Sequence, residues 1–340
     1  MGGFSQQRSC GWLLIILRWA AAMAVLGVLL HFLPLAPLRA AIAQVPVASF
    51  LAVLLAYLLT HCVGAAKWRM VVNAAGARLD FATSAQCYFG GLFGTLFLPS
   101  IVGGDVVRLA VGLERSPRPA AVLTGNLVDR FLDVMAQVAL VVLGLALLPE
   151  LDLVPDELED RLEMLLLAVG VGLILLLAVM FRLRKRILAG RSMRFRRRLA
   201  RLRYAVRSVS KRPRVLVFGW LLGICIQTAF LMLTVELATS CGLALPLRAW
   251  LFAWPLAKLA AVLPLTQGGI GVREAALVGL LAPFGAPAHL VLAAGLVWEG
   301  VVIAGGLITG AVALVIRRRA HRAEAHSTTA KPNGALAARR

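Results

Sequence analysis

The chain has few charged residues, and acids are the scarcer kind. Only 15% of its 340 residues are charged, with 16 acidic residues against 36 basic ones. Its five cysteines show no CxxC spacing, which argues against a disulfide framework and a zinc site. Its five histidines form no HExxH pair, and no Walker motif occurs. The sequence therefore predicts no metal site, no cofactor, no catalytic residues and no nucleotide hydrolysis.

Apolar residues dominate instead. They make up 60% of the chain, more than ordinary soluble domains contain. Apolar stretches of about 20 residues recur, and each is long enough to cross a bilayer core. This composition predicts an all-α polytopic membrane protein. The predicted spans are 12–33, 47–66, 119–148, 161–181, 215–239 and 287–316.

The first span has a second interpretation. Ala41-Ile42-Ala43 is similar to a signal-peptide cleavage site, so 12–33 is either a signal or a span. Its length and the interrupting Arg18 favour a retained span.

One motif occurs twice. LPSIVGGDVVR at 98–108 aligns without a gap to LPLTQGGIGVR at 263–273. The copies lie in two further apolar segments, 82–113 and 248–283. A proline, a glycine pair and an arginine are costly there, because lipid cannot bond to freed backbone groups. Two such interrupted segments in corresponding places indicate a transporter binding site.

The basic residues cluster, and the clusters predict orientation. Fifteen lie in 182–214, which has no acid, and seven follow Ile316. The positive-inside rule makes both regions cytoplasmic and places Lys67 inside as well, whereas the six acids of 149–160 suit the outer side. Residues 182–214 also have the periodicity of an amphipathic helix on the membrane surface. We expect 317–340 to be a basic, disordered tail. No soluble domain presents these charges to nucleic acid.

Three spans separate the two motifs, so the second copy is inverted relative to the first. We expect a transport domain over 1–316 that is an inverted-repeat helical bundle, with repeat one at about 47–148 and repeat two at about 215–316. Each repeat contains a re-entrant hairpin. An alternative with two full spans per hairpin keeps the same parity, but half-segments of about 10–18 residues are short for a crossing.

The repeated motif contributes most of the predicted substrate site. The glycine pairs permit positive φ and close backbone approach, and Asp105 is expected to cap a helix start. Arg108 and Arg273 lie one turn further in, and an arginine near free helix N–H groups forms an anion site. The predicted substrate-binding residues are Gly103, Gly104, Asp105, Arg108, Asp129, Arg130, Gly268, Gly269, Arg273, Glu274 and Glu299.

Carboxylates deep in the predicted spans complete this site. Asp129 lies roughly 15 Å past the start of its helix, and Glu299 lies about as far into its own span. A carboxylate at that depth needs a partner or a proton. We expect the pairs Arg108–Asp129 and Arg273–Glu299, or a coupling proton on either acid. Alternatively, the motif ions pair only among themselves.

Other polar residues have simpler interpretations. Lys258 either lines a pore or extends outward to the membrane surface. Gln227 is expected to make a helix–helix hydrogen bond. Trp68, Trp220, Trp250 and Trp254 are typical of the aromatic belts at membrane interfaces.

Three motifs carry a family resemblance. They are KWR at 67–69, LPSxxGGDVVR at 98–108 with a following DR at 129–130, and LPxxxGGxGVREAALV at 263–278. In these the chain resembles the flippase-like transmembrane family of lysylphosphatidylglycerol synthases, over about 47–316. The resemblance implies an integral plasma (inner) membrane protein of a prokaryote that moves lipids between leaflets. It departs from the usual Ser-Ile-Gly-Gly by having Leu265-Thr266-Gln267 before the glycine pair.

Three function classes follow. The first is a lipid flippase, whose partners are membrane lipids: anionic phospholipid, polyprenyl-phosphate lipid or hopanoid-type lipid. The second is a membrane-embedded lipid-modifying transferase, which the lack of a His/Asp or Ser/His constellation at membrane depth disfavours. The third is a non-transporting scaffold for a lipid-modifying enzyme. Two-domain relatives carry a soluble aminoacyl-transferase domain that does not follow here, so we expect no enzyme activity.

Overall fold

The computed structural model describes residues 35–97, 101–147, 204–261 and 270–329, together with Met23 and Gly27. Its elements over these residues are all helical. They are α2 (Leu35–Ala43), α3 (Val47–Ala74), α4 (Phe81–Phe97), α5 (Ile101–Arg115), α6 (Pro119–Ala146), α9 (Pro213–Ser240), α10 (Leu247–Ala260), α11 (Val272–Leu281), the 3-10 helix η2 (Ala282–Phe284) and α12 (Ala288–Thr329).

Several predicted segments lie outside the described residues. They are most of span 12–33, the acidic loop 149–160, span 161–181, the basic segment 182–203, and tail residues 330–340. Within the tail, the expectation of disorder is wrong for 317–329, because α12 continues to Thr329. Arginine and alanine dominate the start of this extension, and both favour helix.

Three described helices are long and apolar enough to cross a membrane: α3, α9 and the part of α12 up to Ala320. Helix α6 is as long as α3 and α9, with 28 residues or about 42 Å. It differs from them in carrying three closely spaced charges, Asp129, Arg130 and Asp133. The other helices are shorter. Helices α4, α5, α10 and α11 have 17, 15, 14 and 10 residues.

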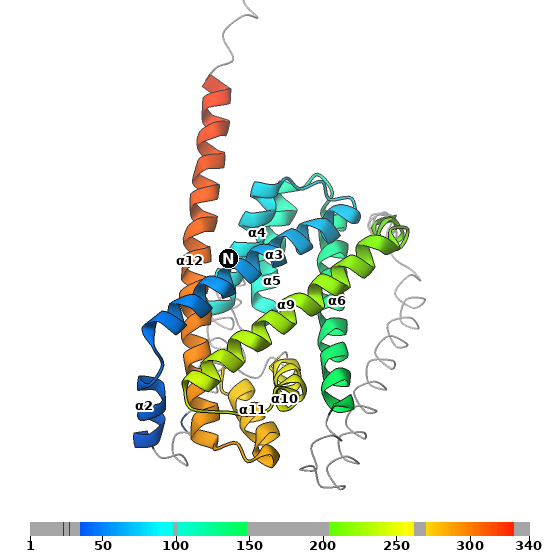
Figure 1. The fold of residues 1–340 in the computed structure, drawn as a ribbon. Coiled ribbons are helices and arrows are strands. Elements are labelled where there is room, and N and C mark those ends of the chain that lie inside the picture. The colour runs from blue at the N-terminus through cyan, green and yellow to red at the C-terminus, as the bar shows by residue number, and fades with distance from the viewer. Residues whose placement is uncertain are drawn as a thin grey trace, which may run out of the picture.

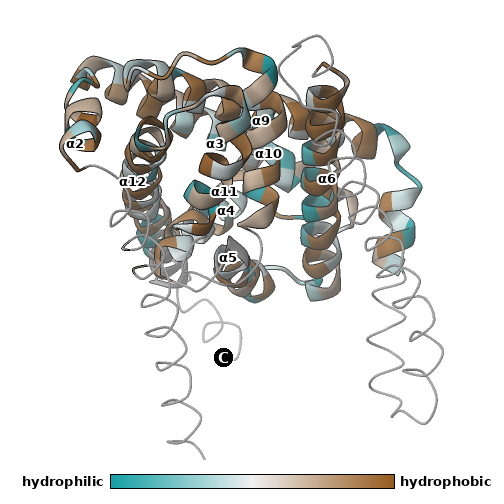
Figure 2. Cartoon of the chain, turned by 90° about the horizontal axis from the view of Figure 1, so that it is seen from below, coloured by the Kyte–Doolittle hydropathy of each residue, from teal (hydrophilic) through white to brown (hydrophobic). Residues whose placement is uncertain are grey.

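Large apolar side chains are exposed on the surface, and charged side chains are buried in the interior. On α3, the large apolar residues Val47, Leu51, Leu55 and Leu59 recur every four residues, and each is more than half exposed. Figure 2 shows hydrophobic residues along the long helices, with hydrophilic positions interspersed on α6. Meanwhile several charged side chains are buried, among them Lys67, Arg108 and Asp129. An apolar exterior around buried ions is the arrangement expected of a chain surrounded by lipid.

The long helices run in opposite directions in pairs. Helices α3 and α9 lie side by side and antiparallel, and α6 runs opposite to α12 (Figure 1). The short helices α4 and α5 lie toward one end of the bundle, and α10 and α11 toward the other (Figure 1).

Short helices from each half of the chain pack on a long helix of the other half. Helices α4 and α5 pack on each other, and α4 packs along α12. In the same manner α10 and α11 pack on each other, and α10 packs along α6. One helix of each short pair, α4 or α10, therefore packs on the long helix that lies far away in sequence.

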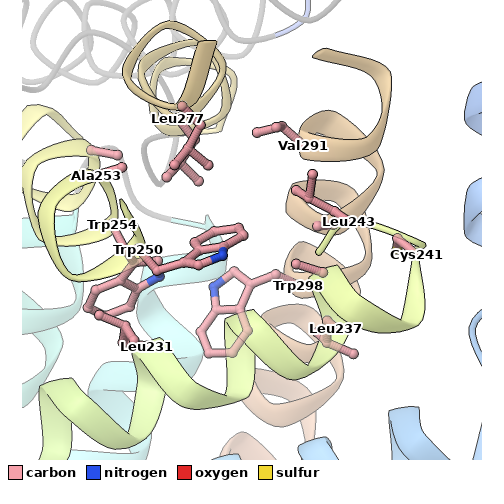
Figure 3. Packing of buried hydrophobic residues seen from close by; sticks show 14 of the residues in the cluster. Leu231, Leu237, Cys241, Leu243, Trp250, Ala253, Trp254, Leu277, Val291 and Trp298 are labelled. Carbon is pink, nitrogen blue, oxygen red and sulfur yellow. The ribbon is translucent and has the colours of Figure 1, made fainter. Parts of the chain in front are cut away.

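Tryptophans fill the core between α9, α10 and α12. Trp250 and Trp254 of α10 and Trp298 of α12 lie close together above Leu231 of α9 (Figure 3). Trp250 and Trp254 are 1% and 3% exposed, and Trp68 of α3 is fully buried. The expectation of an interfacial belt is therefore wrong for these three residues, because all three are buried in the bundle, whereas Trp220 is half-buried.

Candidate functional site

Six charged residues from three helices gather inside the bundle, where α3, α5 and α6 meet. We call them the first charged cluster: Lys67, Asp105, Arg108, Asp129, Arg130 and Asp133. It holds three cations and three carboxylates. Four of these residues were predicted from sequence as part of the substrate site.

Lys67 joins α3 to α6 within this cluster. Its Nζ lies 2.8 Å from Asp129 Oδ1 and 2.6 Å from Asp133 Oδ1. The expectation that Arg108 pairs with Asp129 is therefore wrong. Lys67 was assigned to the cytoplasmic side, yet it is 3% exposed because α3 continues to Ala74 and carries it into the bundle. The signal in the sequence was a lone lysine just after an apolar run, within the KWR motif.

Asp105 of α5 forms ion pairs with two arginines. Arg130 Nε lies 2.9 Å from Asp105 Oδ2, and Arg108 Nη1 lies 3.5 Å from Asp105 Oδ1. Arg108 also stacks on Tyr88 of α4, with 4.2 Å between the guanidinium carbon and the ring centre. Helix α5 begins at Ile101, so Asp105 lies within the helix and not at its start as expected. Its carboxylate serves the arginines instead of capping backbone amides.

The glycines Gly103 and Gly104 also differ from expectation. They lie in α5, and neither has positive φ. A Cβ on Gly104 would stand 2.5 Å from the carbonyl oxygen of Gly91 in α4 and 2.4 Å from Thr95 Cγ2. Gly104 is thus needed for the close approach of α4 and α5, which positions Asp105 and Arg108.

A second group of ions lies where α11 meets α12. We call Arg273, Glu274 and Glu299 the second charged cluster. Arg273 Nη2 donates to Glu299 Oε2 at 2.9 Å, which confirms the expected pair. Arg273 Nε also donates to Glu274 Oε1 at 3.0 Å. The guanidinium therefore spans a carboxylate on its own helix and one on α12.

The start of α11 is occupied by its own side chain. Gly271 has φ +83°, which favours glycine, and its N–H donates to Glu274 Oε2 at 2.7 Å. The sequence predicts that free N–H groups at this helix start bind an anion. The N–H of Gly271 instead donates to the Glu274 carboxylate. Gly295 of α12 leaves room for this carboxylate, since a Cβ there would lie 2.8 Å from Glu274 Cγ. Gly268 and Gly269, predicted as binding residues, lie outside the described residues.

Lys258 of α10 is a functional candidate that the predicted set omitted. Its Nζ donates to Gln227 Oε1 of α9 at 2.7 Å, which confirms the expected helix–helix hydrogen bond of Gln227. It lies 4.6 Å from the ring centre of Trp254 and 5.0 Å from that of Phe230. This lysine points into the bundle and not outward to the membrane surface.

The charges of the two clusters are paired internally. In the part of the chain that the structure describes, no hydrogen bond or ion pair joins one cluster to the other. Arg130 nevertheless keeps 35% of its side chain exposed, and Arg273 keeps 15%. Each of these arginines therefore combines a carboxylate partner with a partly exposed side chain.

Comparison with known proteins gives the family. The profile of the lysylphosphatidylglycerol synthase TM region matches residues 15–327, nearly the whole chain. The chain therefore belongs to this family and is a membrane protein. No curated protein and no solved structure matches it.

Proposed function

We propose that this member of the lysylphosphatidylglycerol synthase TM region family moves a lipid with a polar or anionic headgroup between membrane leaflets. One observation carries the proposal: the bundle holds charged clusters inside an apolar exterior. Ionisable residues at membrane depth are expensive, and they usually mark the route of a substrate. A purely structural bundle gains more from apolar packing than from buried ion pairs.

The headgroup would pass along the polar interior while the acyl chains stay in lipid. An unassisted charged group costs several kcal/mol at the bilayer centre. Arg130 and Arg273 offer guanidinium groups that already have partners and are partly exposed. A phosphate that approaches them would exchange water for charge-assisted hydrogen bonds, which lowers the cost of transfer.

We further propose that α3–α6 and α9–α12 are inverted repeats whose short helices form re-entrant hairpins. The antiparallel pairs of long helices support this arrangement, as does the crosswise packing of α4 on α12 and of α10 on α6. Helix length supports it too. The 14 residues of α10 and the 10 of α11 give about 21 Å and 15 Å, short of the roughly 30 Å of a bilayer core.

Location and substrate complete the proposal. The basic segment 182–214 and the basic C-terminal region would be cytoplasmic in a prokaryotic inner membrane. Candidate substrates are an anionic phospholipid, a polyprenyl-phosphate lipid and a hopanoid-type lipid. The chain would act without chemistry of its own, so no lipid bond would be made or broken.

The test is reconstitution of the pure full-length chain in liposomes with a fluorescent lipid in both leaflets. We expect bleaching from outside to reach more than half of the label, because the protein exchanges it between leaflets, while the lipid stays chemically unchanged. Protein-free liposomes and a variant with Arg273→Gln and Glu299→Gln serve as controls. A chemically altered lipid would instead favour a transferase, and no change of either kind would favour a scaffold.

A further inference from the structure

Lys258 is a cation inside the bundle that has only neutral partners. Its ammonium donates to the Gln227 amide and faces the rings of Trp254 and Phe230. Among the residues that the structure describes, no carboxylate lies within ion-pair distance of it. The other cations of the interior each have such a partner, as Lys67 has in Asp129.

The surroundings of Lys258 attract an anion. Helix α10, which carries it, packs on α6 of the first charged cluster and on α11 of the second. Gln227 occupies one of its three N–H donors, which leaves two for a ligand. An ammonium that contacts only an amide and aromatic rings, with no described carboxylate at ion-pair distance, is costly, and an arriving anion lowers that cost.

We propose that Lys258 binds the phosphate of the transported lipid. The proposal rests on the function proposed above and adds the binding group and the substrate class. A phosphate oxygen would accept from a free N–H group of Lys258, with Arg130 on α6 and Arg273 on α11 adding positive charge. The chemistry is a lipid-borne phosphate, and its source is either a phospholipid or a polyprenyl-phosphate lipid.

Trp254 provides a direct readout of binding, because its ring lies 4.6 Å from the Lys258 ammonium. We would titrate the full chain in detergent with short-chain phosphatidylglycerol, a short-chain polyprenyl phosphate, diacylglycerol of the same chain length and inorganic phosphate. Tryptophan fluorescence would report binding, and a Trp254→Phe variant would identify the responding residue. We expect both phosphate lipids to change the emission, whereas diacylglycerol does not. The source with the higher affinity identifies the lipid.

The decisive variant is Lys258→Met, which keeps the length of the side chain and strands no carboxylate. We expect it to weaken binding of the phosphate lipids by roughly tenfold to a hundredfold, the effect of one charged hydrogen bond. Lys258→Arg should retain most of the affinity. Lys211→Met, at an exposed lysine before α9, is the matched control and should change nothing. If Lys258→Met does not fold, Lys258→Gln gives the same comparison.

Two results would overturn this proposal. One is unchanged affinity in folded Lys258→Met, and the other is inorganic phosphate that binds as tightly as the lipids. Measuring leaflet exchange by the wild type distinguishes failure of the Lys258 site from failure of the proposed transport function. Exchange with binding independent of Lys258 removes this site and keeps the transport function. Binding dependent on Lys258 without exchange keeps the site and removes the transport function.

Discussion

Lys67 of α3 and Asp129 of α6 form an ion pair inside the bundle, with 2.8 Å between the ammonium and the carboxylate oxygen. Their side chains are 3% and 2% exposed. The neighbouring residue Trp68 extends the contact, because its indole N–H donates to Asn126 Oδ1 at 2.9 Å. Two consecutive residues of α3 thus fix the position of α6, and with it the carboxylates of the first charged cluster.

Removal of Lys67 should therefore destabilise the bundle. Lys67→Met leaves Asp129 buried without a cation, and we expect a loss of about 3–5 kcal/mol in the free energy of unfolding. Lys67→Met with Asp129→Asn should recover most of that loss, because Asp133 keeps its contact with Arg130. Denaturation of the purified protein in detergent measures both. A single variant as stable as the wild type would show that the pair contributes nothing.

The arginine of the first motif tests which carboxylate is its partner. Arg108 lies 3.5 Å from Asp105, which keeps Arg130 at 2.9 Å, so Arg108→Gln should be rescued by Asp105→Asn only in small part. Asp129→Asn should not rescue it, because Lys67 already neutralises Asp129. The measurements are protein yield after purification and melting temperature. Rescue by Asp129→Asn alone would support the pairing expected from the sequence instead.

The arginine of the second motif tests the transport site. Arg273→Gln with Glu299→Gln removes the pair between α11 and α12, while Glu274 keeps the N–H of Gly271, so the variant should insert and fold while it loses most leaflet exchange. Arg273→Lys should restore little activity, because an ammonium cannot reproduce the fork of a guanidinium. Size-exclusion chromatography checks the fold, and the liposome assay measures exchange. A folded, fully active double variant would reduce Arg273 to a structural role.

The glycine contact between α4 and α5 gives a packing prediction. Gly104→Ala should cost about 1–3 kcal/mol, because its Cβ would meet the Gly91 carbonyl at 2.5 Å and the backbone must move. Gly279→Ala in α11 is the matched control, since nothing lies within 4 Å of a Cβ there. We expect the control to leave the melting temperature unchanged or to raise it slightly. Equal effects at the two glycines would contradict the packing explanation.

Orientation can be tested with single cysteines in a cysteine-free background. Lys211 precedes α9 and Pro287 precedes α12, and both are exposed. Helices α9 and α12 begin at opposite ends of the bundle (Figure 1). An impermeant maleimide should label Lys211→Cys only after the cells are opened and Pro287→Cys in intact cells. Labelling of both from the same side would rule out the proposed inverted topology.

The sequence by itself determined the class of protein and the position of its long helices. Hydrophobicity and length are local properties, so the boundaries expected at 215–239 and 119–148 lie close to α9 and α6. The motif comparison also identified the family, and it indicated Arg273 and Glu299 as partners because Glu299 lies about as deep in its span as Asp129 does in its own.

Only the tertiary structure decided which charges meet. Lys67 and Asp129 belong to different helices, and their contact depends on how α3 crosses α6, which no local pattern specifies. The role of Gly104 follows from Gly91 on a neighbouring helix, not from the φ freedom that the residue type suggests. Lys258 became informative for the same reason: its importance lies in the absence of a described carboxylate beside it, and that is a property of packing in space.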